Sequence, residues 1–208
     1  TGTCYYNASK VISKYLQPLA NTECVILDTQ SFPNLINGIS FEKDEEDVSY
    51  DVESLFTSIP IKETIDYICD QIYIHKKLKE ICKRSKFVKL MKKLTTECIF
   101  SANNTLYKQT DGVSMGGPLS VVFSGCFMSK MEEEIVLPKS PKFYKRFVDD
   151  IYVRRKKGVE DELFVALNNY HQNIKLTLEK SPKKFLDTPI IYNTENNISF
   201  KVHDNEWY

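Results

Sequence analysis

Two adjacent aspartates, Asp149 and Asp150, stand between two strand-like segments, and this arrangement constrains the fold more than any other feature of the chain. The flanking segments 142–148 and 151–155 are rich in β-branched and aromatic residues, so the sequence predicts a β-hairpin with both carboxylates at its tip. Aspartate is a common turn residue, and such a pair is unremarkable by itself. Here the apolar flanks indicate a buried sheet from whose end two like charges project.

A second strand-like segment contains a further acid. Segment 48–52 has the β-branched and aromatic composition of a strand and carries Asp51 near its end. If this strand lies beside the hairpin, three carboxylates meet at one edge of the sheet, where they repel one another unless a cation joins them. Two magnesium ions bound by such oxygens suit phosphoryl transfer, because they activate the attacking hydroxyl and hold the leaving group. We therefore expect Asp51, Asp149 and Asp150 to be metal ligands, with the backbone carbonyl of Val52 as a further oxygen.

The rest of the chain alternates between helical and strand patterns. Apolar residues recur at helical spacing in 8–19, 61–79, 85–94, 119–135 and 159–171, and further strands are expected at 97–101, 105–109, 174–178, 185–192 and 198–202. We expect Pro18 and Pro138 to close the first and fourth of these helices. This order predicts an α+β fold in which helices back an antiparallel sheet.

Length and charge bound the class of protein. A chain of 208 residues is long enough for one domain with its own core. Lys+Arg and Asp+Glu both total 28, so any surface that attracts nucleic acid must be local. The best candidate is segment 75–93, which holds eight lysines and Arg84 against Glu80 alone. It is either a solvated helix face or a phosphate-binding surface.

The cysteines and the apolar segments indicate where the protein resides. None of the 6 cysteines forms a C-x-x-C pair, which fits a reducing intracellular setting, nuclear or cytoplasmic. The sequence shows neither a signal peptide nor an apolar stretch long enough to cross a bilayer, so we expect no secretion and no membrane partner. Because the chain begins at Thr1 and lacks an evident closing element, we expect it to be a fragment of a longer protein.

Three motifs resemble those of a known family. Segments 50–60 (YDVESLFTSIP), 109–120 (QTDGVSMGGPLS) and 147–150 (FVDD) resemble motifs A, B and C of the reverse transcriptases, in the same order. The first two segments, together with Phe-Leu-Asp at 185–187, most resemble the enzymes of Penelope-like retroelements. The resemblance covers positions 6 to about 192, and it implies an RNA-directed DNA polymerase.

This resemblance also implies an architecture and a set of partners. It predicts a single reverse transcriptase domain over 1–208, with a right-hand polymerase palm at about 45–60 and 96–205 and partial fingers with connecting helices at about 1–44 and 61–95. The expected partners are an RNA template, a DNA primer and dNTPs, with two Mg²⁺ ions as cofactors and Mn²⁺ as their substitute. A nuclease domain is possible in the full-length protein.

Several residues acquire specific roles through the resemblance. Phe56 would be the aromatic gate that excludes a ribose 2′-hydroxyl, or simply a core aromatic residue. Gly112 and Gly116 would let the backbone approach the nucleotide closely, with Gln109 and Asp111 alongside.

Two further roles concern the end of the chain. Lys180 would protonate the leaving pyrophosphate, although Lys183 and Lys184 lie nearby. Phe185, Leu186 and Asp187 would grip the primer terminus, or form an ordinary sheet strand.

Two other readings remain open. One is a catalytically inactive palm that binds RNA through segment 76–93 and the basic cluster 154–157. The other keeps the polymerase but assigns it to a maturase, a retron enzyme or a telomerase-type protein, which the Ser-Leu-Phe-Thr-Ser-Ile-Pro run at 54–60 disfavours.

Overall fold

The computed structural model describes residues 4–37, 39, 42–96, 99–109, 112–158, 161–186, 188–192 and 198–200. Asp111 and Asp187, both expected at the site, lie outside the described residues. None of the described helices is long and apolar enough to cross a membrane.

A four-stranded sheet forms the centre of the structure. Its strands lie in the order β4 (Phe143–Phe147), β5 (Asp150–Lys156), β1 (Glu45–Val52) and β6 (Leu176–Lys180). All three neighbouring pairs are antiparallel. The expected α+β class with an antiparallel sheet is thus confirmed.

One face of this sheet carries the main hydrophobic core. Alternate residues of β1, namely Val48, Tyr50 and Val52, are at most 1% exposed and point to this face. They pack with buried residues of α1 (Cys4–Ala20), α4 (Ile61–Cys69), α6 (Ser120–Met131) and α8 (Glu162–Asn168). The intervening residues of β1, including Asp51, therefore point to the opposite face.

The opposite face has a second, smaller cluster. It joins Ile26 and α2 (Phe32–Asn37) to β7 (Lys184–Phe185) and β8 (Thr188–Tyr192), which with β9 (Ile198–Phe200) form a three-stranded sheet. The ring of Phe185 lies 4.7 Å from that of Phe32 and 5.1 Å from that of Tyr152 on β5. This cluster holds the β7–β8 hairpin over the central sheet.

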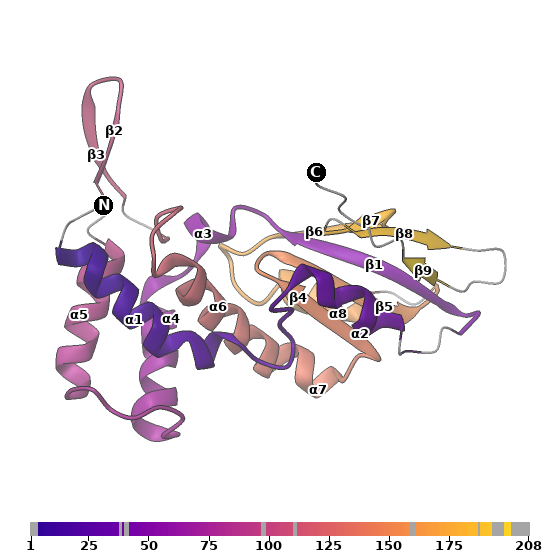
Figure 1. Cartoon of the computed structure of the whole chain (residues 1–208), viewed down its shortest axis with the longest axis horizontal. Coiled ribbons are helices and arrows are strands. Elements are labelled where there is room, and N and C mark those ends of the chain that lie inside the picture. Colours follow the sequence, from indigo (N-terminus) through magenta and orange to yellow (C-terminus); the bar gives the residue numbers. More distant parts are fainter. Residues whose placement is uncertain are drawn as a thin grey trace, which may run out of the picture.

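Three helices gather at one end of the molecule. In Figure 1, α1, α4 and α5 (Arg84–Thr96) lie together at one end of the molecule, and the hairpin of β2 (Ile99–Ala102) and β3 (Thr105–Lys108) projects from that end. Asn103 and Asn104 form the hairpin turn, and both have positive φ, as a type I′ turn requires. The hairpin expected at this position is therefore present.

Helix ends differ most from expectation. Helix α1 continues through Pro18 to Ala20, because a proline in the last turn removes only one hydrogen bond. The long helix expected at 119–135 is α6, the π-helical turn η3 (Glu132–Val136) and α7 (Leu137–Lys139), with Pro138 inside α7. Similarly, α4 passes into the π-helical turn η2 (Asp70–Ile74). The short helix α3 (Leu55–Ser58) follows β1 directly.

Candidate active site

Asp51 and Asp150 occupy directly opposite positions on β1 and β5. Cross-strand partners point to the same face of a sheet, with Cβ atoms about 4.5–5.5 Å apart. For this pair it is the face away from the main core, since the neighbours of Asp51 on β1, Tyr50 and Val52, are buried in that core. Asp51 is exposed and Asp150 is half-buried, so both carboxylates are accessible.

Asp149 lies in the two-residue turn between β4 and β5. Phe147 and Asp150 close this turn as the last cross-strand pair. The Asp149 carbonyl oxygen accepts a hydrogen bond from the Val52 backbone N–H at 3.2 Å, which ties the turn to the end of β1. The three acids, which the sequence separates by almost one hundred positions, thus lie at one end of the sheet.

Burial and mutual repulsion both raise the pKa values of Asp150 and Asp51. Burial, and then the charges of Asp149 and Asp51, raise the pKa of Asp150 from 3.8 to about 6. Burial, and then the charges of Asp149 and Glu53, raise the pKa of Asp51. The protein itself therefore leaves negative charge at this point uncompensated.

The turn carries backbone strain at Val148. This residue has a φ of +56°, whereas Asp149 does not have a positive φ. A positive φ at the first turn residue alone is typical of a type II′ turn, where glycine is usual. A β-branched residue is rarely found there, and the conformation costs on the order of 1–3 kcal/mol. The surrounding structure must therefore hold the turn in place.

The three acids have the right chemistry to bind a divalent cation, but their side chains do not yet surround a single point. Three closely spaced carboxylates supply the hard oxygen ligands that Mg²⁺ and Mn²⁺ prefer. Within the described part of the chain, however, no three His, Cys, Asp or Glu side chains already surround one point in the way a metal requires. A bound cation would have to draw the side chains of Asp51, Asp149 and Asp150 together, while neutralising their repulsion.

A pocket of about 390 Å³ opens beside the acids. It is lined by residues of β1, β5 and β6 and by the β7–β8 hairpin, including Asp51, Asp150, Thr177, Phe185 and Leu186. The structure therefore brings the two described residues of the expected primer grip next to the two cross-strand acids. Phe185 is also buried in the second cluster, so it has the alternative role of a packed strand residue as well.

Lys180 lies apart from the acids. It pairs with Val48 on β1, three residues from Asp51, which is about 10 Å along the strand. Since Val48 points into the main core, the Lys180 side chain leaves the sheet from the face opposite to that of Asp51 and Asp150. Lys184, by contrast, lines the pocket that contains both acids.

Phe56 and the glycine-rich segment are in direct contact. Phe56 is half-buried against the main core, and its carbonyl oxygen accepts a hydrogen bond from Val113 N–H at 2.7 Å. Gly112 has a φ of +66°, and a Cβ atom there would lie 2.4 Å from the Thr57 carbonyl oxygen. Only glycine fits this close approach. Motifs A and B thus meet through their backbones.

The other expected nucleotide-binding residues of motif B differ in exposure. Gly116 has a φ of +78° and open space around it, so its backbone is accessible. Gln109 is half-buried after β3. Asp111 and Asp187 fall outside the described residues, so their expected roles stay predictions.

Solved telomerase structures resemble this fold. Telomerase from Candida albicans, in complex with a fragment of telomeric RNA, matches with a TM-score of 0.64 and 10% identity over 93% of this chain and 38% of that chain. Apo telomerase from Candida tropicalis, truncated from its C-terminal domain, matches with a TM-score of 0.61 and 12% identity over 94% of this chain and 45% of that chain. The chain has a reverse transcriptase-like fold. It spans less than half the length of these telomerases.

Sequence comparisons add nothing to this fold assignment. No protein-family model matches the chain, and neither does any curated protein sequence. At these identities the structural likeness shows the fold alone. It supports the polymerase-like fold expected from motifs A, B and C, and the finer retroelement assignment remains a prediction.

Sequence reasoning did not single out Val148 or the neighbouring Arg146. The strain at Val148 has no signal in a strand pattern, because valine favours strands. Arg146 alternates with Tyr144 and is only 2% exposed. A charged residue at a core-facing position of a predicted strand is the one signal that points to it.

Proposed function

We propose that this chain is the polymerase core of a reverse transcriptase, which extends a DNA primer on an RNA template with dNTPs. The observation that carries the proposal is the direct cross-strand pairing of Asp51 with Asp150, beside a turn that contains Asp149. The reverse transcriptase-like fold supports it. In this proposal the central sheet is the palm, and α1, α4 and α5 belong to the fingers.

Asp51, Asp149 and Asp150 are the proposed metal ligands, with the Val52 carbonyl as a further oxygen. Bound Mg²⁺ ions would supply the activation of the primer 3′-hydroxyl and the neutralisation of phosphate charge. The chain itself presents the carboxylates on one accessible face and fixes the turn to β1 through the Val52 N–H. The pKa values of Asp51 and Asp150 are raised by burial and then by neighbouring carboxylates, whose charge a bound cation would compensate.

Substrate placement follows from the neighbouring elements. Phe56 is proposed as the sugar gate, held by the backbone contact between α3 and the segment at Gly112. Gln109, Gly112 and Gly116 are proposed to line the nucleotide. Phe185 and Leu186 line the same pocket as Asp51 and Asp150, which supports a position for the primer terminus there. Lys180 is not part of this proposal, because its strand position directs it to the other face.

The motif pattern supports a Penelope-like retroelement as the source of the enzyme. The Ser-Leu-Phe-Thr-Ser-Ile-Pro run at 54–60 forms the end of motif A and places Phe56 on α3. The assignment depends on this run together with segment 109–120 and Phe-Leu-Asp at 185–187.

Primer extension tests the proposed function. The full-length protein in which this sequence occurs is given a DNA primer on an RNA template, dNTPs and Mg²⁺. We expect Asp149→Ala/Asp150→Ala to lower extension at least about 1,000-fold, since the metal contributes several kcal/mol. Glu179→Ala is the matched control, because Glu179 lines the same pocket on β6. Equal extension by wild type and the double variant would reject the proposal.

A second candidate function is RNA binding without catalysis. Lys86, Lys89, Lys92 and Lys93 lie on one side of α5, opposite the buried Phe87 and Met91. All four lysines are exposed, and within the described chain none of them forms an ion pair. Such a row suits a phosphate backbone. A protein that binds RNA with a steep salt dependence, yet extends no primer, would favour this function.

A further inference from the structure

Arg146 connects the core to the turn that carries Asp149 and Asp150. It lies on β4, two residues before Val148, and its side chain is on the sheet face that the helices cover. The guanidinium Nη1 donates a hydrogen bond to the Val148 carbonyl oxygen at 3.2 Å. This bond holds the one residue of the turn that has a strained backbone.

Glu132 holds the guanidinium of Arg146 through two hydrogen bonds. Arg146 Nε lies 2.5 Å from Glu132 Oε1, and Arg146 Nη2 lies 3.2 Å from Oε2, so the pair is bidentate. Both side chains are 2% exposed. The hydroxyl of Tyr144 donates to Oε1 at 3.2 Å, and that of Thr22 donates to Oε2 at 3.5 Å. Glu132 is the first residue of the π-helical turn η3.

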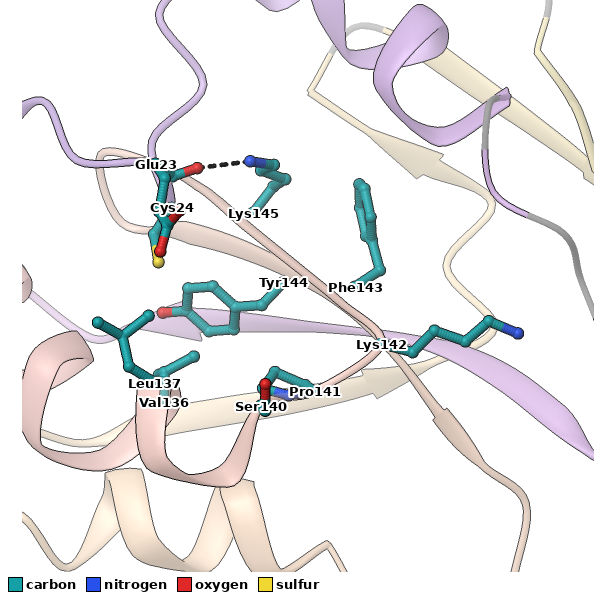
Figure 2. A pocket seen from close by; sticks show the side chains of 10 residues that line it. All are labelled: Glu23, Cys24, Val136, Leu137, Ser140, Pro141, Lys142, Phe143, Tyr144 and Lys145. Atoms are coloured by element: carbon teal, nitrogen blue, oxygen red, sulfur yellow. Dashed lines mark hydrogen bonds between the residues drawn. The ribbon is translucent and has the colours of Figure 1, made fainter.

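The backbone of Arg146 is held as firmly as its side chain. Its N–H donates to the Cys24 carbonyl at 2.8 Å, and its own carbonyl accepts from Ile26 N–H at 2.8 Å. Figure 2 shows the ring of Tyr144 extending from β4. Tyr144 and Cys24 both line a pocket of about 250 Å³. The segment after α1 and the π-helical turn η3 thus both hold β4 just before the turn.

Stability alone does not account for this ion pair. Desolvation of two charges offsets most of their attraction, and apolar residues of similar size would serve a core equally well. A planar guanidinium, in contrast, fixes direction, because it engages a carboxylate through two N–H groups and still has a donor for a third acceptor. Strained turns persist only where their surroundings over-determine them.

We propose that Arg146 is a positioning residue, which through Glu132 on one side and the Val148 carbonyl on the other holds Asp149 and Asp150 in register with Asp51. The inference rests on the proposed function for its catalytic consequence. Its structural part concerns only the order of the turn and its affinity for a divalent cation.

The chain offers a matched control in a second buried pair. Arg154 on β5 pairs with Asp47 on β1, with Nε 2.8 Å from Oδ1 and Nη2 3.3 Å from Oδ2. This pair is also at most 1% exposed. It lies on the sheet face opposite to that of Arg146. Arg154 is four residues from Asp150 along β5, or about 13 Å. If Arg146 acts only as a core ion pair, substitution of Arg146 and of Arg154 should have the same effects.

The experiment compares Arg146→Lys with Arg154→Lys. Lysine keeps the charge but has no planar fork, so it cannot bond to both Glu132 oxygens and to Val148. We expect both variants to lower the unfolding midpoint. Only Arg146→Lys should raise hydrogen exchange in segment 147–152 at least about tenfold and weaken Mn²⁺ binding about tenfold, as loss of outer contacts to metal ligands does. Equal effects of the two variants on exchange and Mn²⁺ affinity would overturn the proposal.

A second variant separates positioning from folding. Arg146→Met/Glu132→Met replaces the ion pair with apolar residues and should retain most of the stability. We expect it to bind Mn²⁺ as weakly as Arg146→Lys, and to lower kcat for primer extension with little change in the KM for dNTP. Wild-type exchange and Mn²⁺ affinity in a stable double variant would also overturn the proposal.

The proposed function and the positioning role fail differently. If wild type extends no primer while Arg146→Lys still loosens the turn and weakens Mn²⁺ binding, the polymerase assignment fails and the positioning role stands. If wild type extends primers and both Arg146 variants match it in exchange, Mn²⁺ affinity and kcat, the positioning role fails alone.

Discussion

Asp51 on β1 and Asp150 on β5 are direct cross-strand partners, so two carboxylates share one face of the sheet at adjacent positions. Like charges opposite each other destabilise a strand pair. This arrangement therefore lowers the stability of the folded protein, and we expect it to bind a ligand. Both consequences can be measured.

Removal of one of these charges should stabilise the protein in the absence of divalent cations. The pKa of Asp150 rises from 3.8 to about 6 on folding, so between these values the folded state holds a proton that the unfolded state has released. The free energy of unfolding of wild type therefore falls as the pH rises from about 4 to 6. We expect Asp150→Asn to be more stable than wild type above pH 6 and equal to it near pH 4.

Denaturant unfolding in a chelating buffer at several pH values checks this expectation. Glu179→Gln is a suitable control, because this exposed residue lies on the same face and has no comparable partner across β1. A difference between Asp150→Asn and wild type that does not change with pH would contradict the account.

Strain at Val148 should be visible when two truncations are compared. Val148→Ala and Val148→Gly both remove the packed side chain, but alanine keeps the penalty of a φ of +56° and glycine does not. We expect the glycine variant to be more stable than the alanine variant by about 1 kcal/mol. At an ordinary strand position the glycine variant is less stable than the alanine variant. A Val148→Gly variant that is less stable than Val148→Ala would therefore show that the turn is unstrained.

Contact between motifs A and B depends on a single glycine. A Cβ atom at Gly112 would lie 2.4 Å from the Thr57 carbonyl and 2.5 Å from that of Phe56. Gly158 also has a positive φ, of +71°, but open space around it. We expect Gly158→Ala to cost about 1 kcal/mol of stability and Gly112→Ala clearly more, because it must also displace α3. Equal losses of stability for the two variants in denaturant unfolding would contradict the close approach of Gly112 to the Thr57 carbonyl.

Part of this structure was predictable from the sequence, and the reason differs from element to element. The hairpin at Asp149 and Asp150 and the strand at Asp51 follow from β-branched and aromatic composition next to turn residues, which is local information. Their pairing is not local, and it was inferred from the chemistry that three acids imply. The helices expected to close at Pro18 and Pro138 end one or two residues later, at Ala20 and Lys139, because a proline in the last turn removes only one hydrogen bond.

Buried charges were beyond sequence reasoning. Charged residues are mostly exposed, yet Asp47 and Glu45 are buried against Arg154 and Lys142. Likewise, no periodic pattern indicates that Arg146 meets Glu132 from a different element. Such pairs depend on which elements adjoin in space, and neither partner's segment contains that information.

The lysine row on α5 gives a separate expectation for nucleic-acid binding. We expect Lys89→Ala/Lys92→Ala/Lys93→Ala to reduce the slope of log affinity against log salt for single-stranded RNA by about 2, since each phosphate contact contributes about 0.7. The control Lys76→Ala/Lys77→Ala/Arg84→Ala removes as many cations, but these are paired with Glu80, Glu133 and Asp70. Equal changes in slope would show that binding senses net charge and not this row.

Binding of Mn²⁺, followed by electron paramagnetic resonance and competition with Mg²⁺, tests the central claim most directly. We predict that Mn²⁺ binds the wild-type chain saturably and that Mg²⁺ displaces it. Asp51→Asn and Asp150→Asn should each weaken Mn²⁺ binding at least tenfold, whereas Glu179→Gln should not. Mn²⁺ binding that is unchanged by Asp51→Asn and Asp150→Asn would contradict the claim that these acids, brought together by β1 and β5, form one metal site.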